Sequence, residues 1–148
     1  MPERFPDVAF HFMTTFARFE EALKRVGYLK NTRAAQADWD AFARDLAPEF
    51  FDEVRQAPEA ATLVTRPPKA RLVSQQGFEW GEPQSITDAV SLFNALRRAR
   101  NNLYHGNKFI GDPDGDQRGE QLLVESLWVL NLALAKNEKL KKATEANA

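Results

Sequence analysis

Apolar side chains recur every three or four positions near the start of the chain. The stripe consists of Val8, Phe12, Phe16, Phe19, Leu23 and Val26. Charged residues at positions 20, 21, 24 and 25 fall on the opposite side. This spacing is typical of an amphipathic α-helix with one buried face. With Asp7 as a cap at its start and Gly27 just past its end, the pattern predicts a helix over residues 7–26.

The next part of the chain alternates short apolar clusters with helix-breaking residues. Asp38 can cap a helix whose apolar side chains are Trp39, Phe42, Ala43 and Leu46. Pro48 suits the first turn of another short helix that extends to about residue 56. Pro58 ends that helix, and a further turn is expected over residues 59–63. The pattern therefore predicts short helices with sharp breaks between them.

Prolines and glycines interrupt residues 66–84 and exclude a regular helix there. Two short apolar stretches, 72–73 and 78–80, fit either a hairpin or an ordered loop. Three cations near its start make the segment a candidate flank for a polyanion; they are Arg66, Lys69 and Arg71. The segment is predicted to be a long insertion between helices.

Two longer amphipathic helices follow the insertion. The first is expected to open at Ser85, with Asp88 in the acidic position of a capping box, and to end near His105. Its predicted buried stripe is Ala89, Leu92, Phe93, Leu96, Ala99 and Leu103. The last helix is expected from Glu120 to about Lys136, with a seam of Leu123, Leu127, Leu130 and Leu134. Residues 139–148 are polar and are expected to fray.

Taken together, these elements predict one all-α domain over residues 1–148. It is an up-and-down bundle of four main helices plus short helices, with the Pro/Gly-containing insertion at about 66–84. The three tryptophans, Trp39, Trp80 and Trp128, are expected in the core or at a dimer interface.

Composition narrows the possible functions. The chain has no cysteine, which excludes disulfides, thiolate metal sites and cysteine nucleophiles. Its net charge is -1, so any binding of nucleic acid must depend on a local patch. No metal-ligand spacing, phosphate-binding loop or dinucleotide fingerprint is present, so neither a metal nor a cofactor is expected. With no signal peptide and no apolar run of about 18 residues, the expected location is the cytoplasm, away from membranes.

Candidate chemistry is concentrated in residues 97–108, which hold four cations, three amides and one of the two histidines. Spacings of four place Arg97, Asn101 and His105 on one helix face. Arg100 lies about 140° round the helix from His105. A histidine can transfer a proton near neutral pH, and a guanidinium offers a planar fork for phosphate oxygens. Such groups suit metal-independent RNA cleavage, in which the 2′-hydroxyl attacks and a cation stabilises the developing charge on phosphorus.

The run Arg100-Asn101-Asn102-Leu103-Tyr104-His105 resembles the R-N-x-x-x-H form of the motif of the HEPN superfamily (higher eukaryotes and prokaryotes nucleotide-binding domain). Its place at the end of the penultimate helix of an all-α domain is also similar. Many members of that superfamily are metal-independent endoribonucleases in toxin–antitoxin, CRISPR-associated and anti-phage systems. The resemblance implies a homodimer with a composite active site, in which His105 is the acid/base, Arg100 stabilises the phosphate and Asn101 is the supporting amide.

Four neighbouring residues are predicted to contact RNA, namely Arg97, Asn102, Tyr104 and Lys108. Tyr104 can stack on a base, or it can pack in the bundle or at the dimer interface. The expected partners are RNA, a second copy of the chain, and an antitoxin or regulatory protein. Structural roles stay open: His105 can interact with the helix dipole, and His11 can be a partly buried structural residue or a second catalytic histidine. The alternative function is a non-catalytic HEPN-like module that binds RNA, a nucleotide or a protein.

Overall fold

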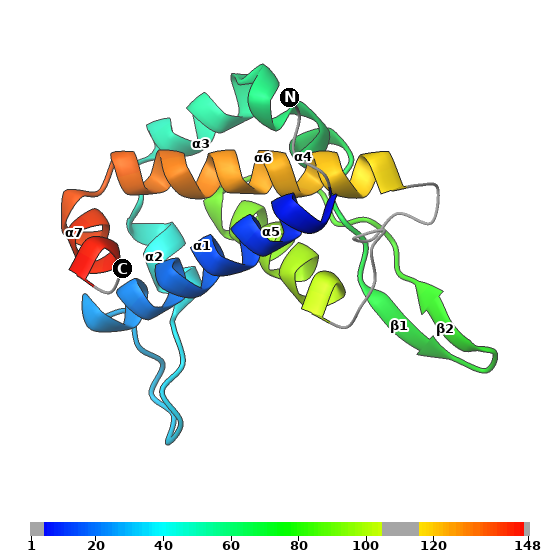
Figure 1. Ribbon diagram of the computed structural model, residues 1–148, viewed down its shortest axis with the longest axis horizontal. Helices are drawn as coiled ribbons and strands as arrows, with labels where there is room; N and C mark the ends of the chain where they lie inside the picture. The colour runs from blue at the N-terminus through cyan, green and yellow to red at the C-terminus, as the bar shows by residue number, and fades with distance from the viewer. Residues whose placement is uncertain (1–4, 105–115, 147–148) are drawn as a thin grey trace.

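Helices account for most of the part of the chain that the structure describes, which is residues 5–104 and 116–146 of a computed structural model (Figure 1). The helices are α1 (Phe5–Arg25), α2 (Trp39–Asp45), α3 (Pro48–Gln56), the short 3-10 turn η1 (Pro58–Ala60), α4 (Ala61–Thr65), α5 (Ala89–Tyr104), α6 (Asp116–Ala135) and α7 (Glu138–Ala146). Within these residues the only sheet is a hairpin of β1 (Arg71–Ser74) and β2 (Gly77–Trp80). The predicted helical class is confirmed.

Helix α1 follows its apolar stripe. Phe12, Phe16 and Phe19 are buried, and Gly27 adopts the left-handed conformation, with φ 109°, just after the helix ends. The helix begins at Phe5, so Asp7 lies inside the first turn and is not the predicted cap. A carboxylate in the first turn still interacts favourably with the positive end of the helix dipole.

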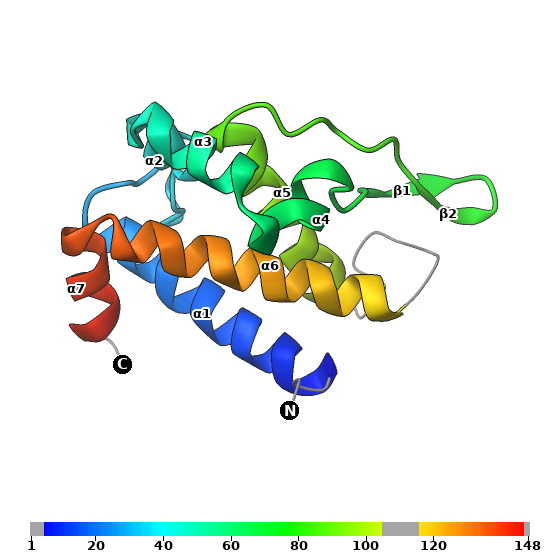
Figure 2. The same cartoon turned by 90° about the horizontal axis from the view of Figure 1, so that it is seen from above.

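Helix α5 occupies the centre of the fold. It contacts α1, α2, α3 and α6. Figure 2 shows α1 and α6 along one side of the molecule and α3 and α4 along the other, with α5 running between them. This position explains why α5 has apolar residues on more than one side: Leu92, Phe93, Ala95, Leu96 and Ala99 are all buried.

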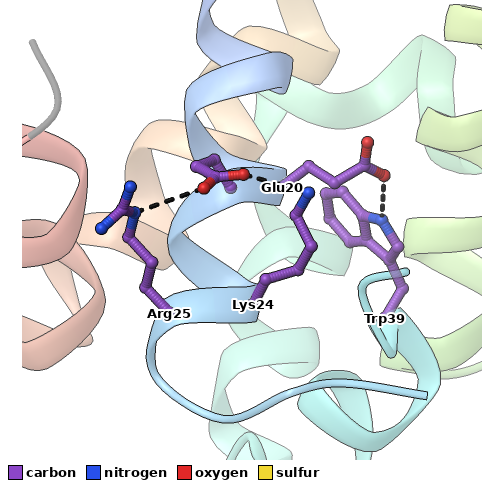
Figure 3. A network of polar contacts seen from close by, with 5 residues as sticks. Glu20, Lys24, Arg25 and Trp39 are labelled. Carbon is purple, nitrogen blue, oxygen red and sulfur yellow. Dashed lines mark hydrogen bonds and ion pairs between the residues drawn. The ribbon is translucent and has the colours of Figure 1, made fainter. Parts of the chain in front are cut away.

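An aromatic cluster fixes the position of α2 against α1. Trp39 stacks on Phe19, with ring centroids 5.2 Å apart, and on Phe16, at 5.0 Å. Its indole Nε1 donates a hydrogen bond of 2.8 Å to Glu20 Oε2 (Figure 3). The buried tryptophan therefore keeps a partner for its one polar atom, and its predicted place in the core is confirmed.

Phe93 connects this cluster to α5. Its ring lies 5.6–6.4 Å, between centroids, from four others, those of Phe19, Trp39, Phe42 and Phe50. These rings belong to α1, α2 and α3. These contacts fix the first half of α5 in the core. The candidate site residues, from Arg97 onward, lie in the second half of the same helix.

The start of α5 differs from the prediction. The helix begins at Ala89, and the cap is Asp88 with Ser91. Asp88 Oδ1 accepts a 2.8 Å hydrogen bond from the Ser91 backbone N–H, and the Asp88 N–H donates to Ser91 Oγ at 3.1 Å. The predicted cap at Ser85 is wrong because this reciprocal pair satisfies the free backbone groups one turn later, with a serine in place of the usual Glu or Gln.

The C-terminal region also differs. Helix α6 begins at Asp116, four residues earlier than expected, and a further helix, α7, follows it. The predicted fraying of residues 139–148 is wrong over the described part of α7. Leu140 is fully buried, its N–H bonds to Asn137 Oδ1 at 3.0 Å, and α7 packs on α1 and α6.

The insertion forms the hairpin that was one of its two predicted alternatives. Leu72 pairs with Glu79 and Val73 with Phe78, and Gly77 supplies the left-handed residue, with φ 112°, after the turn. The hairpin projects from the helices at one end of the molecule (Figures 1 and 2). None of the helices in the described ranges is long and apolar enough to cross a membrane.

Candidate functional site

The C-terminal half of α5 carries the described part of the candidate site, from Arg97 to Tyr104. The predicted site residues His105 and Lys108 lie outside the described residues. Between Ala89 and Tyr104 the helix has three arginines and no aspartate or glutamate. In a chain with net charge -1, this helix is therefore a local concentration of positive charge.

Arg100 turns toward α1. Its Cζ atom lies 5.2 Å from the centre of the Phe16 ring, a cation–π contact. Its Nε atom is buried and has no hydrogen-bond partner among the described residues. Within those residues no carboxylate pairs with Arg100, so the guanidinium keeps its capacity to bind an anion. Donors left unused at a half-buried cation are uncommon in folded proteins, where buried polar groups are normally bonded.

Arg97 and Asn101 lie on the outer side of α5, as their spacing predicts. Asn101 is exposed, and the half-buried Arg97 donates from Nη1 to Asn94 Oδ1 at 3.3 Å. Tyr104, one turn further on, is 68% exposed. It is therefore not buried within the bundle, which was one of its predicted alternatives. The helix thus presents an amide, a guanidinium and an aromatic ring on its outer surface.

Asn102 and Arg98 face a different neighbour, the segment that leads into the hairpin. Asn102 is buried, and its Nδ2 donates to the Lys69 carbonyl at 3.0 Å. Arg98 donates from Nη1 to the Pro68 carbonyl at 3.3 Å and from Nη2 to Gln84 Oε1 at 2.9 Å. Burial lowers the pKa of Arg98. Because the Asn102 amide already bonds within the chain, we do not propose that Asn102 contacts RNA.

Arg98 and Asn102 form a contact face that the motif does not reveal, because both donate hydrogen bonds to the segment before the hairpin. The two residues are four apart, so helical spacing places them on one face. The spacing of four was therefore the one feature of the sequence that could have predicted their shared face. The sequence alone does not identify their partners, because the Lys69 carbonyl is 33 residues from Asn102 along the chain.

Two further predictions concern histidine and metal. His11 is exposed on α1, so its predicted partial burial is wrong. In residues 5–104 and 116–146, no group of three His, Cys, Asp or Glu side chains is arranged to hold a metal ion.

Comparisons of the chain with protein-family models, with curated protein sequences and with solved structures each found no match. The residues of α5 and their neighbours carry the functional proposal.

Proposed function

We propose that the chain is a metal-independent endoribonuclease of HEPN type. The observation that supports this most is Arg100. It is the first residue of the R-N-x-x-x-H motif, its Nε is buried without a partner among the described residues, and no described carboxylate neutralises it. A cation held in this way by an aromatic ring is suited to a phosphate group that arrives with the substrate.

The proposed reaction is cleavage within an RNA strand. The 2′-oxygen attacks the adjacent phosphorus, and the bond from phosphorus to the 5′-oxygen of the next nucleotide breaks. His105 takes the proton of the 2′-hydroxyl, and an acid returns a proton to the leaving 5′-oxygen. The products are a 2′,3′-cyclic phosphate and a 5′-hydroxyl. Arg100 stabilises the charge on the phosphoryl oxygens, and Asn101 holds the substrate or the imidazole through its amide.

The site is proposed to be complete in a homodimer. Arg100 faces Phe16 of α1, whereas Arg97 and Asn101 lie on the outer side of α5. A regular helix places His105 on the side of Arg97 and Asn101, about 140° from Arg100. Two chains that meet along α5 bring the Arg100 of one close to the His105 of the other, so that the dimer holds two sites, each with one Arg100 and one His105.

Toxin–antitoxin or anti-phage defence is the proposed setting, with an antitoxin or regulatory protein as a partner. A neutralising protein fits a ribonuclease that is harmful to its own cell. Acidic side chains on such a partner would complement α5, in which Arg97, Arg98 and Arg100 have no acidic neighbour in the helix.

A second candidate is a non-catalytic HEPN-like module that binds RNA, a nucleotide or a protein. The contact between Arg100 and Phe16 favours it, because a cation–π contact stabilises α5 against α1 without any chemistry. In that case the outer residues of α5, including Tyr104, bind a ligand that is not cut. The two candidates differ in whether RNA is cleaved.

The test is RNA cleavage in excess EDTA by the wild type and by three variants: Arg100→Ala, His105→Ala and Arg33→Ala. Arg33 is an exposed arginine in the connection between α1 and α2 and serves as the matched control. We expect the first two variants to lose about 10²-fold or more in rate and the control to match the wild type. RNA that stays intact with the wild type, or cuts equally with all variants, contradicts the proposal. Binding without cleavage supports the second candidate.

Co-expression of Arg100→Ala and His105→Ala chains tests the composite site. If each site takes its arginine from one chain and its histidine from the other, mixed dimers contain one intact site and cleavage returns. If both residues act from one chain, no intact site forms and no cleavage returns. Light scattering at micromolar concentration that gives the mass of a single chain also contradicts the dimer.

A further inference from the structure

The hairpin β1–β2 is fixed to α5 through both of its ends. On the side that enters β1, the carbonyls of Pro68 and Lys69 accept hydrogen bonds from Arg98 and Asn102. On the side that leaves β2, the Gln84 side chain accepts a second bond from Arg98. An isolated two-stranded hairpin is marginally stable in water at best. These bonds therefore hold the hairpin in a set position relative to the candidate site.

The hairpin exposes apolar surface. Val73 is 84% exposed and Leu72 is 46% exposed, although neighbouring strand residues point to opposite faces. Val73 pairs with position 78, and Trp80 lies two residues beyond it, so Val73 and Trp80 share one face. Trp80 itself is half-buried. No described helix makes extensive contact with either strand of the hairpin.

Charge along the chain indicates what binds there. Residues 66–104 carry six Lys or Arg against three Asp or Glu, a net charge of +3, while the whole chain has a net charge of -1. The hairpin, its two ends and α5 thus form the positive part of a protein that is otherwise negative. An apolar partner protein gains nothing from this charge, whereas a polyanion with flat apolar bases complements both the cations and the apolar side chains of the hairpin.

We propose that the hairpin is an arm that holds single-stranded RNA against α5. Trp80 stacks on an unpaired base, and Lys69, at the entrance to the hairpin, contacts a backbone phosphate. Arg98 and Asn102 are positioning residues that act through the hairpin. A base within a duplex is already stacked on its neighbours, so this arm selects unpaired RNA. The inference rests on the proposed function in one respect, namely that RNA is the ligand of α5.

The first test measures binding of a fluorescein-labelled oligo-uridine in which 2′-O-methyl groups prevent cleavage, by fluorescence anisotropy. Trp80→Ala is expected to weaken binding about tenfold, and Trp80→Phe, which keeps a stacking ring, to change it little. Lys69→Gln is expected to reduce the steepness of the salt dependence by about 0.7 in log Kd per log salt, as for one lost phosphate contact on a single strand. Lys30→Gln, an exposed lysine between α1 and α2, is the matched control and leaves the slope unchanged.

The second test separates positioning from charge. Arg98→Lys keeps the positive charge but cannot make both bonds of the guanidinium fork. We expect it to weaken RNA binding and to speed hydrogen exchange of the hairpin amides. In a chain that already carries Trp80→Ala, the same substitution is expected to have much less effect on binding. An equal loss of binding in both backgrounds would show that Arg98 acts independently of Trp80 and would overturn its positioning role.

The outcomes distinguish this inference from the nuclease proposal. Cleavage of RNA by the wild type but not by Arg100→Ala would support the nuclease proposal. If Trp80→Ala nevertheless binds RNA as tightly as the wild type, the proposed role of the hairpin is wrong. If binding depends on Trp80 and no RNA is ever cut, the arm stands and the nuclease is wrong. Equal affinity for a duplex and a single strand would overturn the proposal that the hairpin selects unpaired RNA. A protein would then be the partner to test on the hairpin.

Discussion

Arg100→Met is the substitution that best separates a functional arginine from a structural one. Arg100 has two described features: a cation–π contact with Phe16 and a buried Nε without a hydrogen-bond partner in the described residues. Methionine matches the aliphatic part of the side chain and removes both the charge and the unsatisfied atom. Its sulfur can keep a favourable contact with the Phe16 ring.

The expected change in stability follows from these two features. Loss of the cation–π contact costs about 0.5–2 kcal/mol. Removal of a desolvated donor that has no partner returns about 1–3 kcal/mol. A sulfur–aromatic contact adds about 0.3–1.5 kcal/mol. The free energy of unfolding is therefore expected to stay within about 1 kcal/mol of the wild type or to rise, while RNA cleavage falls about 10²-fold or more.

Urea denaturation followed by circular dichroism gives the free energy of unfolding, and a labelled RNA gives the cleavage rate. Arg100→Lys is the matched variant: it keeps the charge but loses the planar fork, so its stability is expected to stay near the wild type and its cleavage to fall. A loss of more than about 2 kcal/mol in Arg100→Met would show that Arg100 has a larger structural role, because that loss exceeds the cation–π contact alone. Full cleavage by Arg100→Met would refute the catalytic role.

Three other predictions concern the scaffold that holds α5. Phe93→Ala removes the ring shared by α1, α2 and α3 and is expected to lower the free energy of unfolding by about 3–5 kcal/mol in urea denaturation; a loss below about 1 kcal/mol would contradict its central place. Hydrogen bonds from the Ser91 backbone N–H and hydroxyl hold the pKa of Asp88 below its ordinary value, so the stabilisation is present above the ordinary carboxyl range and is lost as pH falls through the lowered pKa. Asp88→Ala is therefore expected to cost about 1 kcal/mol at neutral pH and progressively less below about pH 4, and a constant difference would contradict this cap. Buried Glu125 accepts a 2.8 Å bond from the Leu63 N–H; Glu125→Ala is expected to cost about 3 kcal/mol and Glu125→Gln about 1 kcal/mol in the same assay, and equal losses would show that the hydrogen bond does not matter.

Long amphipathic stretches made much of the fold predictable. The stripes of α1 and α5 recur at helical spacing over several turns, and the buried residues Phe12, Phe19, Leu96 and Ala99 fall where the stripes place them. Helical periodicity is enough to predict which residues are buried. It does not predict which helix they pack against.

Short elements were harder, for a physical reason. The segment that forms α7 has few apolar residues, and its helix depends on burying Leu140 against α1 and α6 and on the Asn137 cap. The start of α5 was predicted to have Ser85 as its cap and Asp88 in the acidic position of the capping box, but Asp88 itself is the cap. Tertiary packing decided the case of α7, and the hydrogen bonds between Asp88 and Ser91 decided the start of α5.

The candidate site was predictable only in part, for the same reason. Helical spacing correctly separated Arg100 from the side of Arg97 and Asn101. It did not show that Asn102 bonds to the Lys69 carbonyl or that Arg100 lies over Phe16, because those partners are distant in sequence. The roles of His105 and Lys108 stay predictions, as both lie outside the described residues.

The most direct test of the central claim is the chemistry of the RNA ends left by the wild type in excess EDTA. The proposal predicts fragments with 2′,3′-cyclic phosphate at one end and 5′-hydroxyl at the other, and no such fragments with His105→Ala. Intact RNA, or fragments with 3′-hydroxyl and 5′-phosphate ends, would contradict cleavage by the 2′-hydroxyl with Arg100 and His105.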